Sequence, residues 1–233
     1  MWRGMFAVVS AIALVGCATS NVSTQGFTRL ESGRVLLMPP DIKYYRVTAS
    51  GITEPHAEWT GQARTAFDDA FQDFAAGAGI DYKSTDRDEI SDTLADYDRL
   101  HSAVGATIIM SHYGATKLPS KKNAESGSYR FDWSLGPGVA SLADVTDAKY
   151  ALFVYFRDYQ AGGGRVGVAV FAALFGASVY TGHQSGFASL VDLQSGDVVW
   201  FNNLPLAQGD MRSAEGAGRL VEQLFAEFAP DNT

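Results

Sequence analysis

The most reactive side chain in this sequence is that of Cys17, the only cysteine among 233 residues. A thiolate is a strong nucleophile, and with one cysteine no intramolecular disulfide can form. Cys17 closely follows an almost wholly apolar run from Met5 to Val15. That run has the length of the apolar centre of an export signal and falls short of the roughly 20 residues that a membrane-spanning helix needs. Cys17 therefore lies where an export signal is expected to end.

Leu14-Val15-Gly16-Cys17 resembles the lipobox of bacterial lipoproteins. The resemblance implies that residues 1–16 are a signal peptide and that Cys17 is the lipidation site, carrying a diacylglyceryl group with acyl chains such as palmitate. Ala18, rather than Asp, follows the cysteine, which implies an outer-membrane location facing the periplasm. Residues 17–33 are rich in Ser, Thr, Gly and Asn and read as a lipidated, flexible tether. The alternative is an ordinary signal peptide with an incidental cysteine.

Gly162, Gly164 and Gly167 have the G-x-G-x-x-G spacing and follow a predicted strand. In dinucleotide-binding folds such glycines let the backbone approach a pyrophosphate at a helix start. Here no acidic residue stands at the right distance after a second clear strand, and an exported chain is away from the usual nicotinamide pool. The sequence therefore favours a glycine-rich turn, and we expect no cofactor.

Four histidines, His56, His101, His112 and His183, are the other candidates for metal or acid–base chemistry. A zinc site needs three or four convergent ligands, and His101 and His112, eleven positions apart, would share a helical face only if one unbroken helix holds both. No G-x-S-x-G elbow is present either, so a Ser-His-Asp set would have to assemble in three dimensions. We expect His101 at the edge of the core and the other three in solvent, with no bound metal and no catalytic residue.

The charge balance limits the partners. The formal net charge is −8, so the chain repels phosphate backbones and we expect no nucleic-acid partner. Anionic headgroups would not attract it either. Attachment to the bilayer must then come from the acyl chains on Cys17, which stabilise binding by about 0.8 kcal/mol per buried methylene. The apolar fraction of 46% is normal for a globular protein.

Strands and helices alternate along the rest of the chain. Strands are predicted at Val35–Met38, Tyr44–Ala49 and Tyr150–Tyr159, and in a hairpin from Gly186 to Asn202, and Tyr129–Leu135 is predicted as a strand or an extended segment. Helices are predicted over Trp59–Phe74, from Asp86 to Val104, over Val139–Val145 and over Ser213–Phe228. Thr53 is the predicted cap of the first helix and Gly77 or Gly79 its end, and Glu89 is the predicted capping partner at the start of the second. Ala106–Tyr113 could be helix or strand.

This order predicts a single α/β domain over residues 34–230, with a mixed sheet, packed helices and a late antiparallel hairpin in a sandwich-like arrangement. Ala151-Leu152-Phe153-Val154-Tyr155 and the hairpin through Val198-Val199-Trp200 resemble a periplasmic domain shared by the curli-secretion lipoprotein, activators of penicillin-binding proteins and the amino-terminal domain of the Tol propeller protein. The resemblance implies a binding or assembly role on the envelope and transfers no catalytic residue.

Val166 to Val179 is strongly apolar and carries no charge. The favoured interpretation is a buried core helix or a covered loop, since soluble proteins rarely leave such a run open to water. The alternative is an interaction surface that includes Val168, Phe171, Leu174 and Phe175 and meets a protein partner, a second copy or the bilayer. For the whole protein we expect a membrane-anchored, non-catalytic binding or assembly role. A periplasmic hydrolase and an oligomeric secretion subunit are the alternatives.

Overall fold

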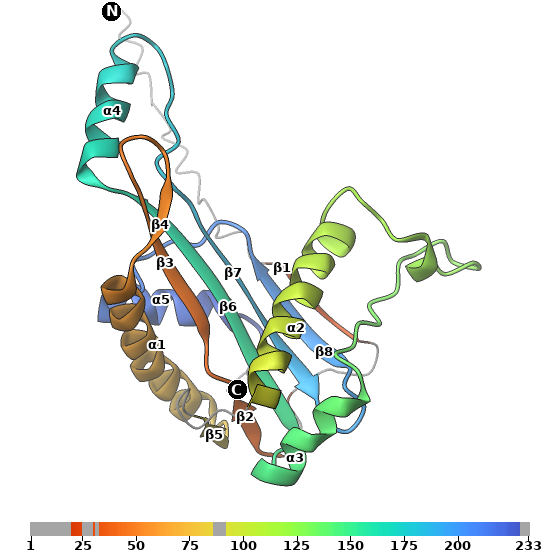
Figure 1. Ribbon diagram of the computed structural model, residues 1–233. Coiled ribbons are helices and arrows are strands. Elements are labelled where there is room, and N and C mark those ends of the chain that lie inside the picture. Colours follow the sequence, from red (N-terminus) through yellow and green to blue (C-terminus); the bar gives the residue numbers. More distant parts are fainter. Residues whose placement is uncertain (1–19, 25–29, 31–32, 86–91, 229–233) are drawn as a thin grey trace, which may run out of the picture.

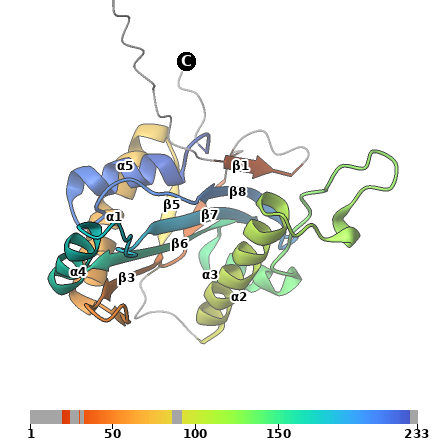
Figure 2. The ribbon, with the colours of Figure 1, turned by 90° about the horizontal axis from the view of Figure 1, so that it is seen from above.

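A computed structural model of the chain describes residues 20–24, 30, 33–85 and 92–228. They form one mixed, eight-stranded sheet with helices on both faces (Figures 1 and 2). The predicted α/β class, with a mixed sheet, packed helices and a late hairpin, is confirmed. The signal peptide, Cys17 and the expected helix start at Asp86 and Glu89 lie outside the described residues.

The centre of the sheet is β6 (Tyr150–Ala161). It pairs in parallel with β2 (Val35–Leu37) and β3 (Asp41–Val47), and antiparallel with β7 (Gln184–Asp192). Pro39-Pro40 separates β2 from β3, because proline cannot donate to the ladder. Helices cover both faces of β6, which explains why the strand reads as a continuous apolar run.

The remaining strands extend the sheet in both directions. β8 (Val198–Leu204) completes the predicted hairpin with β7, and β5 (Tyr82–Ser84) pairs in parallel with β2. β4 (Thr53–Pro55) pairs with β3. β1 (Ser20–Ser23) pairs antiparallel with β8, although it lies in the segment predicted as a tether. Its backbone satisfies a ladder that β8 would otherwise leave unpaired.

Helices α1 (Ala57–Ala78) and α5 (Ala214–Leu224) cover one face (Figure 2). The apolar stripe predicted for the first helix is confirmed, since Ala63, Phe67, Phe71 and Ala75 are buried at four-residue steps. The predicted cap Thr53 is wrong, because Thr53 belongs to β4. Instead the Nδ1 atom of His56 accepts a hydrogen bond from the Trp59 N–H at 3.3 Å. Gly79 ends α1 in the left-handed conformation, as expected.

Helices α2 (Asp92–Ile108) and α3 (Ser141–Thr146) cover the other face. A π-helical turn, Ile109–Tyr113, continues α2, so the undecided segment Ala106–Tyr113 is helical. Gly105 brings α2 close to the sheet, because a Cβ there would lie 2.1 Å from the ring of Phe187. The helices on the two faces enclose separate apolar clusters, one on each side of the sheet.

The connecting segments differ from the expected elements in two places. Of the two states predicted for Tyr129–Leu135, the strand is not formed: the segment makes only isolated bridges, at Tyr129 and Ser134, in a long connection that also holds 3-10 turns at Pro119–Lys121 and Pro137–Ala140. α4 (Gly163–Ala173) is a helix, but none of its residues is buried. No helix in the described part of the chain is both long and apolar enough to cross a bilayer.

Candidate functional site

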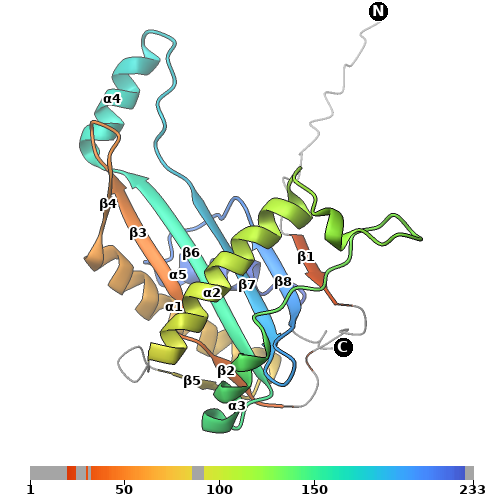
Figure 3. The same cartoon turned by 45° about the vertical axis from the view of Figure 1, so that its right-hand side comes forward.

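α4 lies at the end of an arm that projects beyond the helix-covered part of the sheet. The β6–β7 pairing stops at Asp158 and Gln184, whereas β6 continues to Ala161 beside β3. Figures 1 and 3 show α4 at the far end of this arm, away from α1, α2 and α5. We call α4 together with Leu174 and Phe175 the apolar tip.

Large apolar side chains of the tip are open to solvent. Their exposed fractions range from 41% to 77%, for Val166, Val168, Val170, Phe171, Leu174 and Phe175. The rings of Phe171 and Phe175 are 5.1 Å apart, so they contact each other rather than the sheet. The favoured expectation of a core helix is therefore wrong. The apolar tip lies beyond the part of the sheet that the helices cover, and no other described element packs against it there.

The base of the arm is held by backbone geometry and one arginine. Arg165 donates from Nε to the carbonyl of Tyr180 at 2.9 Å and from Nη1 to the carbonyl of Ala49 at 3.4 Å. Gly182 has φ +122°, and a Cβ there would lie 1.7 Å from the Tyr159 carbonyl oxygen, so only glycine fits. These contacts join the start of α4, the returning chain and the β3–β4 turn.

A row of aromatic side chains lies across that base. Tyr45 and Tyr159 stack with centroids 4.8 Å apart, and Tyr159 stacks on His183 at 5.0 Å. The Tyr180 hydroxyl and His183 Nδ1 share a hydrogen bond of 2.6 Å. We call Tyr45, Tyr159, Tyr180 and His183 the aromatic collar. Sequence reasoning missed it, because its members come from three separate segments and only the pairing of β3 with β6 brings them together.

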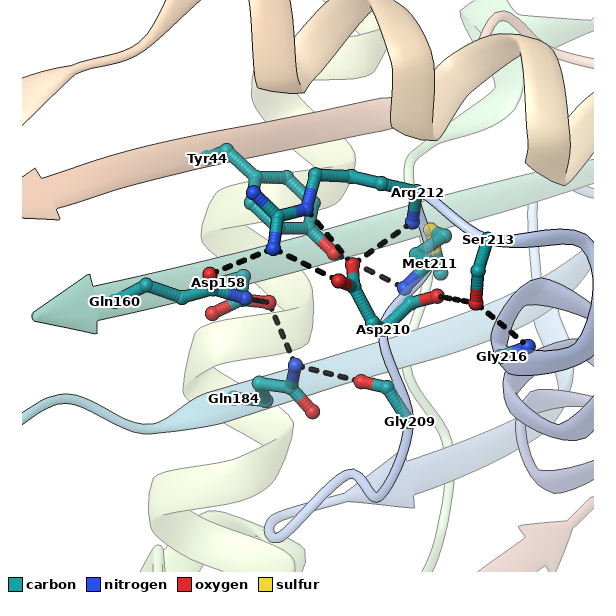
Figure 4. A network of polar contacts seen from close by, with 10 residues as sticks. All are labelled: Tyr44, Asp158, Gln160, Gln184, Gly209, Asp210, Met211, Arg212, Ser213 and Gly216. Carbon is teal, nitrogen blue, oxygen red and sulfur yellow. Dashed lines mark hydrogen bonds and ion pairs between the residues drawn. The ribbon is translucent and has the colours of Figure 1, made fainter.

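A buried polar network lies where the arm joins the body (Figure 4). The Gln184 amide donates to Asp158 at 2.6 Å and to the Gly209 carbonyl at 2.7 Å. Gln160 also donates to Asp158, at 3.0 Å. Arg212 donates to Gln160 at 2.9 Å. The network therefore ties β6 and β7 to the segment that precedes α5.

The charges of this network are shaped by burial. Burial raises the pKa of Asp158, against the opposing effect of hydrogen bonds from Gln184 and Gln160. Burial and the nearby carboxylates of Asp158 and Asp210 raise the pKa of Tyr44. Tyr44 and Asp158 have no exposed surface, so a substrate cannot reach them. The network therefore stabilises the junction of β6, β7 and the segment before α5.

Within the described part of the chain, His101 and Ser189 form a contact that resembles a hydrolase pair. His101 Nε2 lies 2.5 Å from Ser189 Oγ. Both residues are only 1% exposed, and the imidazole stacks on Phe153 with centroids 4.7 Å apart. His101 is thus deep in the core rather than at its edge. Sequence spacing could not reveal the pair, since 88 positions separate its members.

The surroundings do not complete a catalytic triad. His101 Nδ1 is buried and makes no hydrogen bond, whereas a triad needs a carboxylate there to orient the ring. Asp41, whose charge acts on His101, instead accepts from Arg157 at 2.6 Å. Burial lowers the pKa of His101 to about 3, so the ring is neutral at pH 7. The pair therefore stabilises the packing of α2 on the sheet.

The other histidines are separate from one another. His56 caps α1 and stacks on Trp59, and His183 belongs to the collar. His112 lies beside Tyr113 and Phe131, and burial together with the charge of Lys117 lowers its pKa. Within the described ranges, no group of three His, Cys, Asp or Glu side chains is placed to hold a metal ion.

The glycine motif does open a helix after a strand: Gly162 precedes α4, directly beyond β6. The topology differs from that of a dinucleotide site, which needs two parallel strands joined by the helix. Here β6 and β7, the strands on either side of α4, are antiparallel. The motif therefore ends β6 and starts the tip.

A surface cavity of about 420 Å³ lies beside the ends of β2 and β5. Parallel strands with a cavity at their carboxyl ends are a common place for ligands. Its lining contains no histidine or cysteine and comes from Leu37, Met38, Pro39, Pro40, Arg64, Asp68, Asp69, Gln72, Tyr82, Ser84 and Thr85. It offers apolar contacts together with the charged side chains of Arg64, Asp68 and Asp69.

No protein-family model matches the chain, and a search of curated proteins gives no match. Solved structures that are similar include a PelC dodecamer from Paraburkholderia phytofirmans, at 10% identity over 92% of this chain and 98% of that chain, with a TM-score of 0.42. A leucine-to-methionine variant of the same dodecamer gives 12% identity over 91% and 96%, also with a TM-score of 0.42.

Proposed function

We propose that this protein is a bacterial envelope lipoprotein, anchored in the outer membrane through acyl chains on Cys17 and facing the periplasm, with a non-catalytic role in binding or assembly. The observation that carries the proposal is the apolar tip. A contiguous, exposed apolar surface of this kind marks a contact with protein or membrane. The acyl chains would concentrate the domain at the bilayer surface, where such a contact can form.

The placement of the reactive groups supports a non-catalytic role. His101 and Ser189 are sealed in the core, and Asp158 is occupied by amide donors. The side chains with the most perturbed pKa values therefore hold elements together. The exposed and unusual surface is apolar, which suits association better than proton transfer or nucleophilic attack.

The anchor is tested by Cys17→Ala, with Ser20→Ala as the matched control. We expect Cys17→Ala to lose incorporation of labelled palmitate and signal processing, because no other thiol exists to form the thioether. Ser20→Ala should keep both. Ala18→Asp should move the lipoprotein to the inner membrane. A Cys17→Ala protein that is processed at the same bond and still fractionates with membranes would refute the anchor.

The assembly role is tested by crosslinking in intact cells. We expect wild-type protein to form a discrete adduct with a second copy or one specific envelope protein. The double variant Phe171→Ser, Leu174→Ser should lose that adduct, because without the tip's contact with protein or membrane the domain is no longer held where it meets its partner. Leu206→Ser, which changes an equally exposed side chain outside the tip, should keep it. Ser189→Ala should also keep it. If Ser189→Ala removes the cellular role while the tip variant retains it, the hydrolase alternative replaces this proposal.

A further inference from the structure

We propose that the apolar tip inserts into the membrane leaflet that holds the acyl chains of Cys17, as a second membrane contact that fixes how the sheet stands on the bilayer. The inference rests on the proposed lipid anchor. It adds what the tip contacts and which end of the molecule faces the membrane. Three observations support it, from composition, from the collar and from strand direction.

The composition of the tip suits lipid. No charged residue occurs from Val166 to Gly182, and the exposed side chains lie around α4 rather than along one stripe. Val170 follows Val166 by four positions and Phe171 follows Val170 directly, and each of the three side chains is about half exposed or more. A helix that is apolar all round is typical of a core or a lipid phase, and the described fold provides no core at this position.

The collar has the chemistry of a membrane interface. Tyrosine combines an apolar ring with a polar hydroxyl and is enriched where hydrocarbon meets headgroups. Tyr45, Tyr159 and Tyr180 lie at the base of the tip, together with the half-exposed ion pair of Arg46 and Glu54 at 2.8 Å, which is one row nearer to α4 than Tyr45 and Tyr159. The side chains therefore change from apolar in the tip to a mixture of aromatic and charged at its base.

Strand direction places the start of the described chain at the same end as the tip. Ser20 pairs with Asn203, Asn203 with Phe187, and Phe187 with Tyr155, so these four residues form one row across the sheet. Each of the three pairings is antiparallel. β1 therefore runs away from the tip, as Figure 3 shows, and its first residue, Ser20, is at the end of the strand that is nearer to α4.

The dimensions agree with a shared interface. Cys17 is three residues before Ser20 and can reach about 10 Å beyond the row. Tyr159 is four residues past Tyr155 on β6, or about 13 Å. Three residues of extended chain would thus cover most of the distance from this row to the collar. The 11 residues of α4 span about 16 Å, which is about half of a hydrocarbon core of about 30 Å.

The experiment places single reporters on the full, acylated lipoprotein in phosphatidylcholine vesicles. Because the thiol of Cys17 is consumed by its thioether, Leu174→Cys provides a unique site for an environment-sensitive dye. Gln194→Cys is the matched control, an exposed residue in the β7–β8 turn at the opposite end of the sheet. Phe171→Cys is a second tip reporter in case the first variant fails to fold. Spin-labelled lipid in the vesicles is the quencher.

We expect spin-labelled lipid to quench most of the fluorescence of the tip reporters and aqueous iodide to quench little of it. The reporter at position 194 should be quenched by iodide and little affected by spin-labelled lipid. Tip reporters quenched only by iodide would overturn the proposal. Tip reporters that resist both quenchers would be covered by protein, a second copy or a partner, and would overturn it as well. Mass spectrometry of the same sample separates the two proposals: an unmodified Cys17 refutes the anchor, whereas an acylated protein with an unquenched tip refutes only the insertion.

Discussion

Phe156 and Phe175 lie on opposite sides of the glycine run, and burial separates their energetics. Phe156 has no exposed surface, whereas Phe175 is 74% exposed. We expect Phe156→Asp to unfold the protein, because a buried, unpaired carboxylate costs several kcal/mol against a total stability of about 5–15 kcal/mol. Phe175→Asp should change stability by only about 0.5 kcal/mol. Thermal melts of both variants check this. A large loss of stability for Phe175→Asp would mean that Phe175 is buried in the core rather than exposed in the tip.

The buried imidazole of His101 makes stability depend on pH. Its pKa is lowered from 6.5 to about 3, so the unfolded chain binds the proton more readily than the folded one. The contribution of His101 is therefore full above pH 6.5 and is lost as the pH falls below it. Between pH 7 and pH 5 this should cost about 2 kcal/mol.

The measurement is urea unfolding of the wild type and of His101→Gln, which keeps a polar partner for Ser189. Carboxylates contribute equally to both proteins, so the difference between the two curves isolates the histidine. The wild type should lose more stability than the variant as the pH falls. Parallel curves would mean that the imidazole titrates normally and is not sealed in the core.

At the scale of elements, glycines set how closely helices approach the sheet. A Cβ at Gly105 would meet the Phe187 ring, whereas nothing lies within 4 Å of a Cβ at Gly61 in α1. We expect Gly105→Ala to destabilise the protein by about 1–3 kcal/mol through overpacking. Gly61→Ala should stabilise it by about 1 kcal/mol through helix propensity. Chemical denaturation of both variants tests the close packing of α2, and equal effects would contradict it.

At the scale of the whole molecule, net charge and anchoring act separately. A chain with a formal net charge of −8 gains nothing from anionic lipids. We therefore expect the acylated protein to float with vesicles equally well in low salt and in about 1 M salt, where charges are screened beyond about 3 Å. Release by salt would show that charged contacts, rather than acyl chains and the apolar tip, hold the protein to the bilayer.

Local patterns were sufficient for the long elements of the body, whereas the short strands β1, β4 and β5 were not predicted. The stripe through Phe67 and Phe71 predicted α1, and the dense apolar run from Tyr150 predicted β6. The turn before Val198 predicted the β7–β8 hairpin. These signals work because the periods of helices and strands, and the residues that end them, are properties of neighbouring positions. The cap of α1 was missed because the acceptor is a ring nitrogen of His56, whereas a hydroxyl or carboxylate oxygen usually accepts this hydrogen bond.

The candidate site was decided by tertiary structure. The sequence identified Val168, Phe171, Leu174 and Phe175 as apolar, but an apolar run indicates only that something should cover it and not what does. The pairing of β3 with the end of β6 carries that run past both covered faces of the sheet. The same pairing assembles the aromatic collar, and the approach of α2 seals His101 against Ser189. Contacts between residues so far apart in the chain leave no mark on local spacing, so only the folded arrangement could separate surface from core.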